Sequence, residues 1–287
     1  MRRLIAVSRE GARMGRFIAV SRSIRIALGL LRQEMGSLRV MLGYLLGMTF
    51  LALALNDFFG YAMEIKEPVN IWEAFIVMGN QSIPGRFWVL GYLFVIADAP
   101  FVRRNTYMLL YRSGRWVWNM GMLLYVLIQA FLYLGCFAAG SVIAGIPSGF
   151  SGRLWSSPVY LLATHSSNTI AEKYHIFFDG AAMMEHMTVL QAFGITFLYL
   201  FCYAAFLGIL LYVCNLILGG FWGLMAVAAV HVGGAVLSFA GRLHQSPVYY
   251  VDGAGSWWRY PGMMAVCIFA MAFVSMTAAG RVDIQAR

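Results

Sequence analysis

The sequence has little charge for its length, and this shortage argues against an ordinary soluble protein. Only 11% of the 287 residues are Asp, Glu, Lys or Arg, against roughly 25% in a soluble domain. Hydrophobic residues make up 61% of the chain, and the mean hydropathy is +0.73. So few charged side chains cannot cover a surface that faces water. Lipid must therefore solvate much of the molecule.

The long apolar runs also lack any alternation of polar and apolar residues. Every strand of a membrane β-barrel shows that alternation, whereas a membrane helix needs an unbroken apolar run. The sequence therefore predicts an all-α, polytopic bundle of membrane helices.

Several signatures of catalysis are absent. The only lysines are Lys66 and Lys173, and neither follows a glycine, so the chain has no GxxxxGK[ST] loop to hold the phosphates of ATP. No GxSxG element occurs. We expect no catalytic residue, metal or cofactor in this chain. The four cysteines form no CxxC pair and lie in apolar runs, where they are expected to be small buried hydrophobic residues: Cys136, Cys202, Cys214 and Cys267.

Six apolar segments are predicted to be membrane spans of about 20 residues each. They are 38–56, a short one at 87–102, 117–144, two spans within 192–241, and 261–279. The paired glycines Gly219 and Gly220 are predicted to divide the 192–241 run by a tight turn. The first 37 residues precede the spans, the longer connections are 57–86, 145–191 and 241–260, and residues 281–287 form a tail.

The distribution of basic residues predicts the orientation. With the N-terminus inside, 15 of the 21 arginines and lysines lie on the cytoplasmic side and six lie outside. Cytoplasmic loops carry such an excess, so both termini are predicted to be cytoplasmic. The net charge of +9 is explained by this asymmetry, and we expect no nucleic-acid partner.

A repeat agrees with this span count. The pattern GRL followed by SPVY occurs at 152–160 and again, 89 residues later, at 241–249. Each copy follows an outward-going span, which requires an even number of crossings between them. A pair of similar outer caps is one interpretation, and coincidence in a sequence of low diversity is the other.

An amphipathic helix is predicted before the first span. Its apolar residues are spaced three or four apart, as on one helix face: Phe17, Val20, Ile24, Leu28, Leu31 and Met35. Arg22, Arg25 and Arg32 lie off this stripe, although Ile26 and Leu30 interrupt the polar face. Such a helix is expected to lie along the inner headgroups of the bilayer. A plain basic anchor is the alternative.

The basic loop between the second and third spans is a candidate docking segment. Tyr107, Leu110 and Tyr111 fall on one face of a short helix, with arginines around it. An apolar face with a charged rim suits a groove on a soluble partner. An ordinary basic loop would show similar charge.

This loop resembles that of bacterial ABC transporter type-2 permeases. The resemblance rests on Asp98-Ala99-Pro100-Phe101-Val102-Arg103-Arg104, followed by Arg112-Ser113-Gly114-Arg115, and on the amphipathic helix and six-span plan. It implies a permease in the cell inner membrane, paired with a second permease copy or with a homologous permease. It also implies a coupling helix docked on a separate cytosolic ATPase that binds ATP and Mg. The residues implied to dock are Phe101, Arg103, Arg104, Tyr107, Leu110, Tyr111, Arg112 and Arg115. The segment 145–191 is longer than is usual for the family.

That long outer segment leaves open a metal-dependent membrane enzyme. It holds several possible zinc ligands: His165, Glu172, His175, Asp179, Glu185 and His186. A helix would place Glu172, His175 and Asp179 on one face, but the spacing matches no known metal signature. An amphipathic outer cap is the simpler prediction. A third interpretation is a membrane component of a larger complex with no transport of its own.

Four polar residues fall within the predicted membrane depth: Asp98, Gln129, Asn215 and His231. Polar groups at such depth are functional candidates. Asp98 is expected to pair with Arg103 or Arg104. His231 could line a pathway or relay protons, or could be a neutral histidine hydrogen-bonded to a neighbouring helix.

Overall fold

The molecule is an all-α bundle. The computed structural model describes residues 2–80, 87–100, 110–147, 149–164, 169–239 and 258–281, and in these ranges the side chains of 2–17, 235–239 and 280–281 are not described. Four helices in the described part are long and apolar enough to cross a membrane. They are α2 (Leu38–Ile65), α6 (Arg115–Gly145), α10 (Val189–Leu218) and α12 (Arg259–Arg281). The predicted class of a multi-pass helical membrane protein is confirmed at this level.

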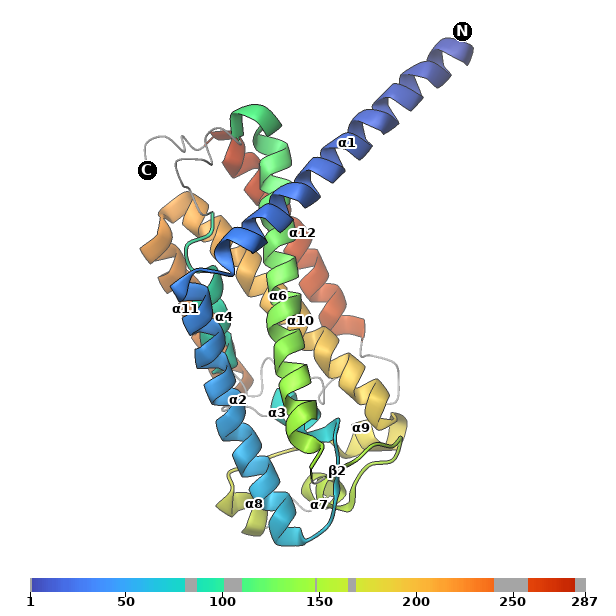
Figure 1. Cartoon of the computed structure of the whole chain (residues 1–287), viewed down its shortest axis with the longest axis vertical. Helices are drawn as coiled ribbons and strands as arrows, with labels where there is room; N and C mark the ends of the chain where they lie inside the picture. The colour runs from blue at the N-terminus through green and yellow to red at the C-terminus, as the bar shows by residue number, and fades with distance from the viewer. Residues whose placement is uncertain are drawn as a thin grey trace.

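Helix α1 (Arg2–Glu34) packs on α6 at one end of the bundle, and its N-terminal part projects away from it (Figure 1). Three residues later α2 begins, where the side chain of Ser37 accepts a hydrogen bond from the Val40 N–H. Such a cap satisfies one free donor of the first turn. Helix α2 runs nine residues beyond the predicted end at residue 56 and closes at Lys66 in the left-handed conformation (φ 62°).

The second predicted span, 87–102, is wrong as a single helix. Helix α4 (Trp88–Ile96) has only nine residues, about 13 Å of helix at 1.5 Å per residue, against a hydrocarbon layer of about 30 Å. A second short helix, α3 (Glu73–Asn80), lies in the segment 57–86, which was predicted to be a connection on the outer side of the membrane. Almost all of its side chains are buried, and it packs against α6 and α10.

The break predicted at Gly219 and Gly220 is present. Helix α10 ends at Leu218, Gly219 has a φ of 95°, and α11 (Gly220–Phe239) begins at the next residue. At this positive φ a side chain would be strained, so glycine is required. The other end of α10 is set by a capping box between Thr188 and Gln191.

Short elements cover the end of the bundle opposite α1 (Figure 1). Two-residue strands β1 (Val69–Asn70) and β2 (Gly149–Phe150) pair in parallel. Short helices α7 (Ser157–Thr164), α8 (Thr169–Lys173) and α9 (Ala181–His186) complete this capped end. The copy of the repeat at 152–160 supplies the bend before α7, while the copy at 241–249 lies outside the described residues.

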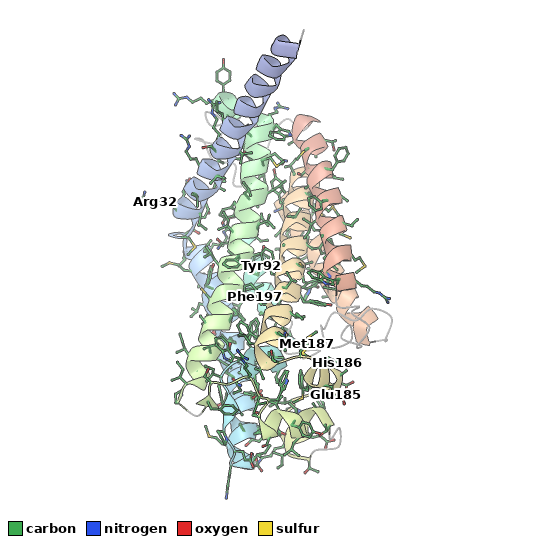
Figure 2. All side chains as sticks on the ribbon, turned by 90° about the vertical axis from the view of Figure 1, so that its right-hand side faces the viewer. Arg32, Tyr92, Glu185, His186, Met187 and Phe197 are labelled. Atoms are coloured by element: carbon green, nitrogen blue, oxygen red, sulfur yellow. The ribbon has the colours of Figure 1, made fainter. Side chains whose placement is uncertain are left out.

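Glycines allow α2 and α4 to pack backbone to backbone. A Cβ on Gly43 would lie 2.8 Å from the Gly91 carbonyl oxygen, and a Cβ on Gly91 would lie 2.6 Å from that of Gly43. Small residues permit such close approach of membrane helices. Buried tyrosines fill the wider spaces, and Tyr92 (Figure 2) and Tyr133 lie next to this contact.

Candidate functional site

An ionic junction joins three segments at the α1 end of the bundle. Arg39, in the first turn of α2, contacts Glu34 at the end of α1 (Nη2–Oε2 3.2 Å) and Asp98 just after α4 (Nε–Oδ2 3.1 Å). Arg39 Nη1 also donates to the Phe94 carbonyl of α4 at 3.3 Å. The Glu34 side chain is almost fully buried, while that of Asp98 is 70% exposed. One arginine therefore ties α1, α2 and α4 together.

Among the described residues, Asp98 pairs with Arg39, which lies 59 positions earlier in the sequence. The arginines expected to pair with Asp98, Arg103 and Arg104, lie outside the described residues, so that pairing stays a prediction. Arg39 reaches Asp98 because α2 and α4 pack closely side by side.

Asn215 holds the chain that leaves α4. Its Nδ2 donates to the carbonyls of Ala97 (2.8 Å) and Ala99 (2.7 Å), which flank Asp98. Asn215 lies near the end of α10 and is 4% exposed. Carbonyls just after a helix end have no helical partner, so this side chain satisfies them. The polar residue predicted at membrane depth therefore has an architectural role.

The segment 101–109 follows this clamp and lies outside the described residues, with predicted docking residues Phe101, Arg103, Arg104 and Tyr107. The residues that follow segment 101–109 contact the bundle. Leu110 packs against the buried cluster around Trp118 on α6, and Arg115 Nη1 donates to the Ala279 carbonyl of α12 at 3.5 Å.

Leu110 and Tyr111 do not share an exposed face, in contrast to the prediction. Leu110 is only partly buried and faces the bundle, whereas Tyr111 is 94% exposed. Arg112, Arg115 and Trp116 are exposed beside it. The accessible part of the predicted docking face is therefore the Tyr111 side.

Part of the amphipathic stripe on α1 points away from the bundle. Val20, Ile24 and Leu28 are exposed, whereas Leu31 packs against the buried cluster around Trp118. Met35, just after α1, is exposed in part, but its Sδ accepts a hydrogen bond from Gln129 Nε2 at 3.9 Å; the side chain of Phe17 is not described. Arg32 also projects outward (Figure 2). These orientations agree with a helix lying on a membrane surface.

A second face of α1 packs on α6. Ile26 and Ala27 are buried, and Ser23 Oγ donates to the Val117 carbonyl at 3.0 Å. Ile26 fits over Gly121, where a Cβ would lie 2.7 Å from it. Ile26, which interrupts the predicted polar face, is therefore a packing residue.

Gln129 and His231 both have tyrosine partners, of which Tyr44 is partly buried and Tyr203 is buried. Gln129 Nε2 donates to Tyr44 Oη at 3.4 Å, while its Oε1 finds no hydrogen-bond partner among the described residues. His231 Nδ1 lies 2.7 Å from Tyr203 Oη, between α11 and α10. His231 therefore matches the alternative of a histidine that is hydrogen-bonded to a neighbouring helix, since its bond to Tyr203 joins α11 to α10.

Two clusters of buried polar side chains were not predicted from the sequence. In the bundle, Asn119, Tyr212 and Ser275 join α6, α10 and α12 through bonds of 2.6 Å and 3.0 Å. At the capped end, Glu73 is fully buried and accepts three bonds: from the Asn70 N–H (2.9 Å), the Ser156 N–H (2.6 Å) and Ser156 Oγ (2.5 Å). Glu73 and Ser156 are 83 positions apart, and no pattern in the sequence predicts their contact.

The helical face that Glu172, His175 and Asp179 would share in a continuous helix does not form. Helix α8 ends at Lys173, and His175 has a φ of 53°, so Glu172, His175 and Asp179 do not share a helix. No group of three His, Cys, Asp or Glu side chains gathers within the described ranges. His165 lies outside them, and Glu185 and His186 lie on α9 near the capped end (Figure 2).

One exposed ion pair is found in this region. Lys173 Nζ lies 2.8 Å from Glu64 Oε2 of α2. The hydrogen bond to Glu64 raises the pKa of Lys173. A pair this exposed contributes little to stability.

No family model, curated protein or solved structure matches this chain. The function must therefore be argued from the geometry at the two ends of segment 101–109 and from the resemblance of its sequence.

Proposed function

We propose that this chain is the membrane-spanning permease subunit of an ABC-type transporter, in which segment 101–115 contacts a separate cytosolic ATPase. The observation that carries the proposal is the anchoring of this segment at both of its ends. Arg39 and Asn215 hold the chain before it, and Leu110 and Arg115 hold its C-terminal part.

This anchoring suits the transmission of force. A displacement of the segment acts through Asp98 on α1 and α2, through Ala97 and Ala99 on α10, and through Arg115 on α12. Coupling between distant sites needs such packed and hydrogen-bonded links between rigid elements. Rocking of whole helices between two arrangements is a known form of such transitions.

The proposed topology has six crossings with both termini in the cytoplasm. Helices α2, α6, α10, α11 and α12 each cross once, and α3 and α4 together make the remaining crossing in two pieces. Interrupted helices are tolerated at membrane depth where protein surrounds them, and most side chains of α3 and α4 are buried. This plan places Arg22, Arg112 and Arg115 inside.

The proposed partners follow from the same interpretation. ATP and Mg would be bound and hydrolysed by the ATPase, and a second permease copy would complete the translocation route. This chain would carry out no covalent chemistry. We do not propose a metal-dependent enzyme, because the described histidines and acids of 169–186 lie apart.

Tyr111→Asp tests the proposal. Purification of the tagged chain from its native host should recover a P-loop ATPase with measurable ATP hydrolysis. Loss of an exposed aromatic contact together with an added negative charge should lower that recovery about tenfold or more. The matched control is Tyr160→Asp, because Tyr160 is also exposed but lies on α7 at the capped end.

Equal recovery of the ATPase with both variants would refute docking through Tyr111. Recovery of a membrane complex that contains no ATPase would instead favour a component without transport of its own.

A further inference from the structure

We propose that a groove at the end of α2 binds the headgroup of a phospholipid that carries a primary amine, such as phosphatidylethanolamine. The inference goes beyond the proposed function, because it concerns the capped end of the chain and holds with or without an ATPase. It rests on the volume of the groove, on two exposed charges of opposite sign in its wall, and on its level at the end of a membrane-spanning helix.

One wall of the groove is a single face of the last turns of α2. Phe59, Ala62, Met63 and Lys66 line it, and they are spaced three or four positions apart, as on one side of a helix. Ala62 is buried, Phe59 is partly buried and Met63 is 69% exposed. This wall is therefore apolar along the helix and ends in the positive charge of Lys66.

The chain that leaves α2 supplies the rest of the wall. Lys66 has a φ of 62°, and its N–H donates to two carbonyls in the last turn of α2, which ends the helix and turns the chain. Glu67, Pro68 and Val69 then line the groove. Its volume of about 320 Å³ lies within the roughly 300–1,000 Å³ usual for small-molecule sites.

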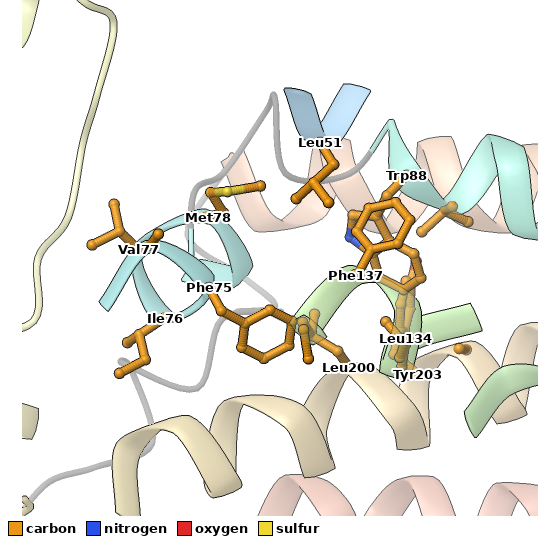
Figure 3. Close-up of a cluster of buried hydrophobic side chains, with 14 of the residues drawn as sticks. Leu51, Phe75, Ile76, Val77, Met78, Trp88, Leu134, Phe137, Leu200 and Tyr203 are labelled. Carbon is orange, nitrogen blue, oxygen red and sulfur yellow. The ribbon is translucent and has the colours of Figure 1, made fainter. Parts of the chain in front are cut away.

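Hydrogen bonds and packing fix this second part of the wall. Val69 pairs with Gly149 in the short sheet, and the Asn70 N–H donates to the Glu73 carboxylate at 2.9 Å. Ala62 and Val69 belong to the main buried hydrophobic cluster, and Figure 3 shows the part of this cluster around α3. The groove is therefore formed before a ligand arrives, which lowers the cost of binding.

Lys66 and Glu67 place a positive and a negative group next to each other in the groove. Both side chains are exposed, and neither forms an ion pair with another described residue. Glu64, two positions before Lys66, is by contrast already paired with Lys173 at 2.8 Å. The ligand that suits this groove therefore carries an anion and a cation close together, beside an apolar part.

The groove lies at the headgroup level of a bilayer that α2 spans. Helix α2 is long and apolar enough to cross a membrane. Its 28 residues extend about 42 Å at 1.5 Å per residue, close to the roughly 40–45 Å of a bilayer with its headgroups. Lys66 directly follows the last residue of α2, at the capped end (Figure 1). Phospholipid headgroups are therefore the zwitterions in constant contact with the groove.

A phosphoethanolamine headgroup matches the groups in the wall. Its phosphate can accept a hydrogen bond from Lys66 Nζ, and its ammonium group can donate to the Glu67 carboxylate. The start of an acyl chain can lie against Phe59 and Met63. Phosphatidylcholine differs at one point, because its quaternary ammonium group has no N–H to donate. Phosphatidylglycerol carries no cation to place beside Glu67.

Competition between lipids tests the site. The purified and delipidated full chain in detergent is given an equimolar mixture of phosphatidylethanolamine, phosphatidylcholine and phosphatidylglycerol with identical acyl chains. Native mass spectrometry then counts the bound lipids. We expect phosphatidylethanolamine to be retained about tenfold more than phosphatidylcholine. Equal retention of these two lipids, or a preference for phosphatidylglycerol, would overturn the proposal.

Glu67→Gln should remove this selectivity, because the amide keeps the size of the side chain and loses its charge. The ratio of retained phosphatidylethanolamine to phosphatidylcholine should fall about tenfold. The matched control is Glu172→Gln, at an exposed acid of α8 that does not line the groove, and it should leave the ratio unchanged. Equal ratios in the two variants would show that Glu67 does not bind the amine.

Lys66→Asn tests the phosphate contact without straining the backbone, since asparagine tolerates the left-handed conformation. The change should lower the retention of phosphatidylethanolamine and phosphatidylcholine alike by about fivefold or more, because both lipids carry the phosphate. Unchanged retention of both lipids would count against a headgroup site in this groove.

Discussion

Single buried polar side chains decide where the irregular segments of this protein lie. Glu73 holds the start of α3 against the chain before α7, and Asn215 holds the chain after α4. Each of them satisfies backbone groups that no regular element pairs. The sequence does not predict the burial of these side chains. An acid such as Glu73 is usually exposed, and its partner Ser156 is distant in the chain.

Glu73→Ala should destabilise the protein. The change leaves the N–H groups of Asn70 and Ser156 buried without acceptors, and bonds to a charged acceptor are worth about 1.5–3 kcal/mol each. We expect a loss of about 3 kcal/mol, because the bonds are not additive, and a lower Tm in detergent. Glu185→Ala, at an exposed acid of α9, is the control. Equal Tm values for the two variants would show that Glu73 does not hold the cap.

The contact between α2 and α4 is the tightest feature at the scale of the elements. Gly43 and Gly91 leave no room for a Cβ between the two helices, and a Cβ on Gly47 would meet Tyr133 of α6. Through this contact Arg39 reaches both Asp98 and the Phe94 carbonyl. The spacing of Arg39 and Asp98 therefore depends on glycine packing several residues away.

Gly91→Ala should force α4 away from α2. Its Cβ would meet the Gly43 carbonyl oxygen at 2.6 Å and the Gly47 nitrogen at 2.9 Å, and overpacking of this kind costs about 1–3 kcal/mol. Gly135→Ala on α6 is the matched control, because open space surrounds that position, and alanine there should stabilise the helix by about 0.5–1 kcal/mol. Thermal unfolding in detergent measures both, and a Tm for Gly91→Ala as high as that of Gly135→Ala would contradict this packing.

Elements with strong local signals could be predicted from the sequence. Gly219 and Gly220 marked the α10–α11 break, and the start of α2 at Leu38 coincided with the start of a long apolar run. Helix α3 was missed because it has eight residues and carries Glu73 and Asn80, so that hydropathy alone places it in a loop. Its burial depends on Ser156 and Thr196, which only the fold brings near.

The whole molecule is asymmetric from end to end. The α1 end carries Arg22, Arg25, Arg32 and Arg115 on exposed positions, while the opposite end is closed by short elements that are bonded to one another. The arginine count predicted this difference, but the pairings within each end could not be predicted because they join distant parts of the chain.

Accessibility of single cysteines tests the orientation of the whole molecule. In a variant that lacks the four native cysteines, Tyr111→Cys should react with an impermeant maleimide only from the cytoplasmic side, and Lys66→Cys only from outside. Both positions are exposed; Lys66 follows the C-terminal end of α2, and Tyr111 precedes the N-terminal end of α6. Reaction of Tyr111→Cys from the outside alone would invert the topology and remove the proposed docking role.

The division of one bundle position between α3 and α4 has a mechanical consequence. Two separate short helices can move independently, so that α3 can stay fixed while α4 tilts. Here Glu73 fastens α3 to the capped end, whereas Arg39 and Asn215 fasten the far end of α4. Helix α3 ends at Asn80 and helix α4 begins at Trp88, with residues 81–86 between them outside the described part of the chain. In the proposed permease, α4 would therefore move together with the cytoplasmic segment that follows it, while α3 stays bonded to the capped end through Glu73.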